Sequence, residues 1–145
     1  MRFMIILKTT PESEKEGAFP DPELMAEMGK FNEELIKAGI VLAMDGLQPS
    51  SKGARVKFSG KSRTVIDGPF TESKELLAGF WIWQVKSLEE AIEWVKRCPN
   101  PHDVESEIEI RQIGEMEDFA PVLSEEQIQY KIAKRAELPN QTFDK

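Results

Sequence analysis

The chain contains one cysteine and one histidine, and this scarcity excludes several kinds of site. A single Cys98 excludes an internal disulfide and any metal site built from clustered cysteines. It lies beside Pro99 at the end of an apolar helical pattern, so we expect a packed thiol and not a nucleophile. His102 has no second histidine at metal-ligand spacing, which predicts a solvated loop imidazole. We expect neither a bound metal nor a cofactor.

Long apolar runs and clustered basic residues are also missing. No run approaches the ~20 apolar residues of a membrane-spanning helix. The start, MRFMIILKTTPESEKE, has neither the apolar length nor the cleavage pattern of a secretory signal. With 19 basic against 26 acidic residues the formal charge is -7, which repels phosphate backbones and anionic membranes. We therefore expect a cytoplasmic protein that binds neither nucleic acid nor membranes.

Strand patterns recur along the first 113 residues of this 145-residue chain. Four segments have the β-branched, aromatic or alternating composition of strands: 2–8, 40–47, 79–85 and 105–113. Residues 54–67 alternate on both sides of Ser59 and Gly60, which predicts a hairpin. In the aromatic segment 79–85, Trp81 and Trp83 share one face because side chains alternate along a strand.

Two amphipathic patterns predict helices. The first begins at Asp21, an N-cap followed by proline, and ends at Gly39. The second follows the capping box SLEE, in which Ser87 accepts from the Glu90 N–H while the Glu90 carboxylate returns to the Ser87 N–H, and Pro99 ends it. Their expected buried stripes are Leu24, Met28, Phe31 and Leu35 in the first helix, and Leu88, Ala91, Ile92 and Val95 in the second.

The order β, α, β, hairpin, β, α, β predicts an α+β fold, a ferredoxin-like sandwich with two helices on one face of the sheet. A second copy is the simplest cover for the other face, so we expect a homodimer, a dimeric α/β barrel. Residues 114–145 follow this domain. Over 118–145 a capping box at Ser124 and Gln127 opens a mostly polar helix. We expect a C-terminal helical arm, either packed across the dimer or loosely ordered.

A longer match lies in the middle of the chain. The run DGPFTESKE, followed by GFWIWQVKSLEEAIEWVKRCP and IEIRQI, closely resembles the DGPF-type, YCII-related family over about residues 1–113. The resemblance implies a ferredoxin-like domain that dimerises into an α/β barrel with a cleft, and it implies no common reaction. Related YCII domains are thought to use a His and Asp pair in acid-base chemistry. This chain departs from that pattern, because His102 lies in a late loop, so a His-dependent mechanism does not carry over.

The turn VIDGPFTESKE, residues 65–75, carries more charge than a chain reversal needs. An Asp in a turn usually accepts from the N–H two residues on, but residue 69 is proline and has none. Asp67 therefore either fixes the turn through the Phe70 N–H or serves as a cleft carboxylate. We expect Gly68 and Pro69 to hold Asp67 and Phe70 toward the same cleft as the aromatic strand. A positive φ at Gly68 would make Gly68→Val destabilising.

Other charged candidates also have structural explanations. Glu72 and Glu75 suit the first turn of a short helix, and Lys74 suits a surface ion pair. Asp45 ends a strand, where turn residues are common. Arg111 lies between acids on the polar face of a strand, where it either pairs with them or binds a carboxylate ligand.

Two functions fit these residues. In the one we favour, a dimeric protein holds a small metabolite in a cleft near the DGPF loop, without chemistry. In the alternative, a small-molecule lyase or isomerase uses Asp67 or Asp45 as general acid or base. The candidate ligand-binding residues are the aromatic roof and two cations for an anionic oxygen: Phe70, Trp81, Trp83, Lys74 and Arg111.

Overall fold

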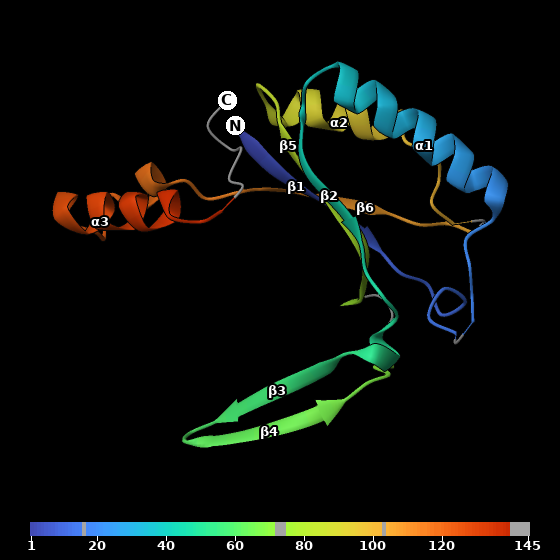
Figure 1. Ribbon diagram of the computed structural model, residues 1–145, viewed down its shortest axis with the longest axis horizontal. Helices are drawn as coiled ribbons and strands as arrows, with labels where there is room; N and C mark the ends of the chain where they lie inside the picture. Colours follow the sequence, from blue (N-terminus) through green and yellow to red (C-terminus); the bar gives the residue numbers. More distant parts are fainter. Residues whose placement is uncertain (16, 72–74, 103, 140–145) are drawn as a thin grey trace.

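The computed structural model describes residues 1–15, 17–71, 75–102 and 104–139. Its main sheet has four strands: β1 (Arg2–Lys8), β2 (Val41–Gly46), β5 (Leu77–Gln84) and β6 (Ile108–Gln112). They pair antiparallel in the order β2-β5-β1-β6. Helices α1 (Pro22–Lys37) and α2 (Leu88–Lys96) cover one face of this sheet (Figure 1). The order is that of a ferredoxin-like fold with a hairpin inserted between β2 and β5, which confirms the predicted α+β class.

The core lies between the sheet and the two helices. Phe3 pairs with Trp83 and Ile5 with Trp81 across β1 and β5, so all four side chains point to the same face. Phe31 of α1 packs edge-on against both tryptophan rings, with centroids 5.9 and 6.4 Å away. All five are buried, and burial of each such side chain contributes about 1.5–3 kcal/mol.

Helix α1 begins and ends where the sequence predicts. The Asp21 carboxylate accepts from the Glu23 N–H at 3.2 Å, and Pro22 occupies the first helical position. Gly39 has a φ of 72°, the left-handed conformation that ends a helix at little cost in glycine. Phe31 and Leu35 form the buried part of the predicted stripe.

Helix α2 departs from the prediction in two details. Ser87 accepts from the Glu90 N–H at 3.1 Å, but the Glu90 carboxylate accepts from the Lys86 N–H, at 2.8 Å, and not from Ser87. The predicted stripe was partly wrong, because Leu88 and Ile92 are exposed, whereas Ala91 is buried and Trp94 and Val95 pack against the core. Successive residues of an α-helix are turned by about 100° around its axis, so Ile92 points away from the face that Ala91 occupies. Trp94, three positions after Ala91, returns to that face and packs against the core.

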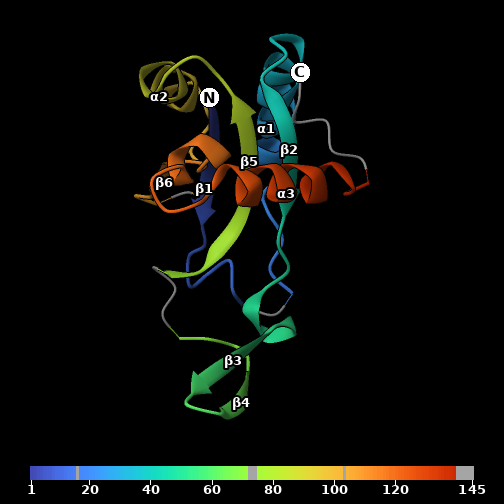
Figure 2. The same cartoon turned by 90° about the vertical axis from the view of Figure 1, so that its left-hand side faces the viewer.

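Strands β3 (Ala54–Ser59) and β4 (Ser62–Asp67) form the predicted hairpin, separate from the main sheet. Gly60, with a φ of 58°, makes the turn between them. Every residue of both strands is exposed. Figures 1 and 2 show the hairpin extending beyond the end of the main sheet. A short 3-10 turn, η1 (Ser50–Lys52), precedes it.

The other face of the main sheet is turned away from α1 and α2. Strand alternation places Met4, Ile6, Phe80 and Ile82 on this uncovered face, where they are half-buried. Helix α3 (Glu125–Ala136) stands in front of it (Figure 2) and packs against η3 (Met116–Phe119). None of the helices in the described ranges is long and apolar enough to cross a membrane.

The root of the C-terminal arm is tied to β1. The Arg2 guanidinium donates two hydrogen bonds to the Glu115 carboxylate, at 2.7 and 2.9 Å. The Arg2 bond holds the pKa of Glu115 below its usual value. The predicted capping box of α3 is present, with Ser124 and Gln127 bonded reciprocally at 3.1 and 2.8 Å. A partly buried ion pair therefore fixes where the arm leaves the domain.

Candidate functional site

A cleft lies between α1 and the ends of strands β1, β2 and β5. It consists of two adjoining hollows of about 480 and 630 Å³, which share Pro20, Leu24, Gly46, Ala78 and Pro101 in their walls. Gly46 pairs with Gly79 across β2 and β5. A Cβ on Gly79 would lie only 2.9 Å from the Asp45 carbonyl oxygen. The close approach of these strands needs glycine, and the missing side chains leave room for the cleft.

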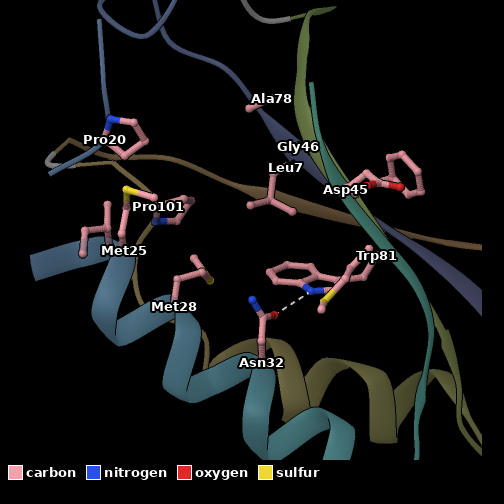
Figure 3. Close-up of a pocket in the computed structure, with 14 residues that line it drawn as sticks. Leu7, Pro20, Met25, Met28, Asn32, Asp45, Gly46, Ala78, Trp81 and Pro101 are labelled. Atoms are coloured by element: carbon pink, nitrogen blue, oxygen red, sulfur yellow. Dashed lines mark hydrogen bonds between the residues drawn. The ribbon is translucent and has the colours of Figure 1, made fainter. Parts of the chain in front are cut away.

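The inner hollow is apolar with one polar pair. Met25, Met28 and Leu7 lie in its wall with Trp81, whose indole N–H donates to the Asn32 Oδ1 at 2.9 Å (Figure 3). Because the oxygen is bound in this way, the Asn32 amide nitrogen is left with two N–H donors. It has no hydrogen-bond partner among the described residues and points into the hollow. This amide can bind a ligand acceptor.

The outer hollow is more polar than the inner one, and His102 lies in its wall. The His102 Nε2 is 2.8 Å from the Lys8 carbonyl oxygen, at the end of β1. Because a carbonyl only accepts, Nε2 carries a proton, and Nδ1 lies 3.5 Å from the Ser13 Oγ. The expectation of a solvated loop imidazole was wrong, because His102 is half-buried against a strand 94 residues away in sequence.

The charge of the cleft is acidic. Glu12, Glu14 and Asp21 lie in the wall of the outer hollow, and no lysine or arginine lines either hollow among the described residues. Glu14 is already engaged, because its carboxylate accepts from the Ser50 N–H at 2.9 Å and the Ser50 hydroxyl at 2.8 Å. In the described ranges no three His, Cys, Asp or Glu side chains gather closely enough to hold a metal ion.

The DGPF turn is fixed by Ser50 and not by Asp67. The Phe70 N–H donates to the Ser50 Oγ at 3.1 Å, and the Gly68 N–H donates to the Gly53 carbonyl at 3.0 Å. The φ of Gly68 is not positive, so that expected reason for glycine was wrong. Glycine is required instead because a Cβ on Gly68 would overlap the Ser50 backbone carbonyl.

Asp67 and Phe70 line neither hollow. Asp67 is exposed at the base of the hairpin, and its side chain makes no hydrogen bond or ion pair with the described residues. The Phe70 ring lies under the Arg55 guanidinium, 3.9 Å from it. Within one chain, the prediction that these two residues face the same cleft as the aromatic strand was therefore wrong.

The remaining candidates are spread over the domain. Trp81 lines the inner hollow, whereas Trp83 is fully buried in the core, out of reach of any ligand in this conformation. The Asp45 backbone borders the cleft, but its side chain points away from Leu7 and Met28 (Figure 3). Lys74 and Glu72 lie outside the described residues. The ligand-binding and catalytic roles of all these residues stay predictions.

Of the two roles expected for Arg111, pairing with neighbouring acids or binding a carboxylate ligand, the structure contains the ion pair. It pairs with Glu109 at 3.2 Å on the uncovered face, and Glu109 also pairs with Lys8 at 3.3 Å. Hydrogen bonds from Arg111 and then Lys8 hold the Glu109 pKa below its usual value. Cys98 is packed, and burial raises the pKa of its thiol to about 12, which agrees with the predicted unreactive thiol.

Sequence alone could not have placed Asn32 and His102 in the cleft. Asn32 lies on the first helix and His102 in a late loop, and their partners are 49 and 94 residues away. Neither residue belongs to a motif with a chemical meaning. The one available signal was the apolar stripe of α1, which indicated a helix packed on the sheet but not a gap beside it.

Comparison with known proteins gives a family and no reaction. The model of the YCII-related domain family matches residues 1–117. An uncharacterised protein of Rhizobium meliloti (strain 1021) is 28% identical over 94 residues, which are 65% of this chain and 76% of that protein. The family match confirms the resemblance seen in the sequence.

Proposed function

Because this chain belongs to the YCII-related domain family, we propose that it is a homodimeric protein that binds a small metabolite in the cleft beside α1. The observation that carries this proposal is the cleft itself, an apolar hollow that adjoins a more polar one. Its two parts, about 480 and 630 Å³, lie within the roughly 300–1,000 Å³ of small-molecule sites. The Asn32 amide supplies a polar group that fixes ligand orientation.

The lining favours a neutral or cationic ligand with an apolar body. Met25, Met28 and Trp81 offer flexible and aromatic surface to the apolar part. An anionic ligand would meet Glu12 and Asp21 at the mouth with no described basic residue beside it. The sequence suggested an anionic ligand, held by Lys74 and Arg111. Neither residue is among the described residues that line the cleft.

Metabolite binding is tested by thermal shift with matched α1 variants. A ligand at 100 times its dissociation constant adds about 2.7 kcal/mol of stability, so amines, neutral metabolites and carboxylates can be screened by calorimetry. Met25 lines the cleft and is 59% exposed, so Met25→Trp should fill part of the cleft without disturbing the core. Ile36→Trp is the control, 55% exposed on the same helix and outside both hollows. The stabilising shift should vanish in the first variant and persist in the second. An equal shift in both would refute this location.

The uncovered face of the main sheet is the reason for proposing a homodimer. Met4, Ile6, Phe80 and Ile82 give that face an apolar centre, and a second copy packed on it would bury more than roughly 1,200 Å² in total. Sedimentation at about 5 µM should give a dimer. A single species at the 16.5 kDa of one chain would refute the assembly.

The lyase or isomerase alternative has less support. A general base must reach the proton that it abstracts. Asp45 and Asp67 are exposed, and the Asp45 side chain points away from the cleft. His102 does lie at the mouth, but its Nε2 proton is held by the Lys8 carbonyl. We therefore propose binding without a reaction.

A further inference from the structure

The β3–β4 hairpin has no support within one chain. Every residue of both strands is exposed, and neither strand packs extensively on another described helix or strand. Val56, Phe58 and Val65 are 51%, 69% and 65% exposed. An isolated two-stranded hairpin is marginally stable in water, and it gains stability when a face is buried against another element. The hairpin therefore has the features of an element that packs on something outside its own chain.

The two faces of the hairpin differ. The register pairs Val56 with Val65 and Phe58 with Arg63, so these four side chains share one face. Arg63 lies over the Phe58 ring, 4.4 Å from its centroid. On the opposite face Lys57 pairs with Thr64. One face is thus mostly apolar with a cation at its edge, and the other is mostly polar apart from Ile66, which pairs with Arg55.

The hairpin is also the basic part of an acidic chain. Residues 54–67 contain four basic residues and one acid, which gives them +3 and leaves -10 for the rest of the chain. The expectation that the chain has no basic patch was therefore wrong, because the net charge concealed this segment. A basic element on an acidic body is electrostatically complementary to another copy of the same body.

The position of the hairpin agrees with that partner. It extends on the same side of the main sheet as α3, the side of the uncovered face (Figures 1 and 2). That face is where we place the second copy, so the hairpin would continue the same interface. In a two-fold dimer each copy gives one hairpin and receives one, which leaves neither exposed.

We propose that the β3–β4 hairpin docks on the second copy of this chain. Its apolar face, Val56, Phe58 and Val65, is buried against the partner copy, and Arg63 on the same face and Lys61 in the turn meet acidic surface there. The proposal rests on the proposed homodimer and assigns to it an element outside the main sheet.

Excision of the hairpin is the direct test. Ala54 and Asp67 are paired neighbours, so Asn-Gly can replace residues 55–66 as a two-residue turn. Circular dichroism should show a folded domain. Sedimentation equilibrium should give a dimer dissociation constant at least ~10-fold above that of the full chain, because the docked face is lost.

Point variants keep the test valid if the excised chain does not fold. Phe58→Ser with Val65→Thr removes the apolar face and should also weaken the dimer at least ~10-fold. Thr64→Ser on the opposite face is the control and should change the constant less than ~2-fold. Salt should weaken the wild-type dimer, and Lys61→Gln with Arg63→Gln should flatten that dependence.

The outcomes separate this proposal from the homodimer itself. A wild-type chain that is monomeric at ~5 µM removes the dimer and the docking together. A wild-type dimer whose constant is unchanged by the hairpin variants overturns the docking and leaves the dimer. Binding of a single-stranded oligonucleotide that is lost on excision, with dimerisation unchanged, would assign the hairpin to nucleic acid and also overturn the docking.

Discussion

Two glycines beside the hairpin approach the same carbonyl group and should respond differently to alanine. A Cβ on Gly68 would overlap the backbone carbonyl of Ser50, whereas a Cβ on Gly53 would lie 3.5 Å from that oxygen, an ordinary contact. We predict that Gly68→Ala destabilises the protein and that Gly53→Ala does not. The pair forms a matched control, because both substitutions add one methyl group at the same turn.

The magnitude follows from the hydrogen bonds that must move. Separating Gly68 from Ser50 disrupts the Gly68 N–H bond to Gly53 and the Phe70 N–H bond to the Ser50 hydroxyl. Two partly buried hydrogen bonds contribute about 2 kcal/mol. Alanine also lowers the conformational entropy of the unfolded chain, which stabilises the folded protein by about 0.5 kcal/mol. We expect Gly68→Ala to lower the free energy of unfolding by about 1.5 kcal/mol, and Gly53→Ala to change it by less than about 0.5 kcal/mol.

Urea unfolding followed by circular dichroism measures both changes, provided that the slope with urea is the same in all three proteins. The midpoint should fall for Gly68→Ala and stay near wild type for Gly53→Ala. Equal midpoints for the two variants would refute the reasoning, because the prediction rests on the overlap of a Gly68 Cβ with Ser50.

Three further predictions concern Glu115, the C-terminal arm and the Cys98 thiol. The Glu115 pKa is lowered in the folded protein, so its pairing with Arg2 stabilises the protein above the ordinary Glu pKa and is lost as pH falls through the folded value. Glu115→Gln should lower the free energy of unfolding by about 1–2 kcal/mol at pH 7. This is less than the loss of a fully buried pair would cost, because the Glu115 side chain is 37% exposed. In urea unfolding, the difference between wild type and variant should shrink toward pH 3. Removing residues 124–145 should change the free energy of unfolding by less than about 1 kcal/mol, because α3 packs on η3 and makes no extensive contact with a described strand of the sheet. An unfolded truncate by circular dichroism would contradict this. Cys98, with its pKa raised to about 12, should react with iodoacetamide at pH 8 at least ~100-fold more slowly than in urea, and equal rates would show an accessible thiol.

Local signals in the sequence predicted the elements of this fold well. Asp21 with Pro22 marks the start of α1, and Gly39 marks its end, because capping depends on residues adjacent in the chain. Strand alternation likewise placed Trp81 and Trp83 on one face. The ferredoxin-like order followed from these elements, since few topologies accommodate two βαβ units.

Contacts between distant segments were not predictable in the same way. The DGPF turn looked self-contained, but Ser50, 20 residues earlier, holds the Phe70 N–H. His102 reaches the end of β1 by a loop whose path no pattern specifies. The candidate site therefore moved from the turn to the cleft beside α1, because a site depends on which segments meet and not on the residues of one segment.

The hydrogen bond from Trp81 to Asn32 has a practical consequence. It holds an indole ring in the wall of the inner hollow, while Trp83, 5.7 Å away between centroids, is sealed in the core. The emission of an indole depends on the polarity around it and on its hydrogen bond, so a molecule that enters the hollow should change the tryptophan fluorescence of the protein through Trp81. The protein thus carries an intrinsic optical reporter of the occupancy of its cleft, without an attached dye.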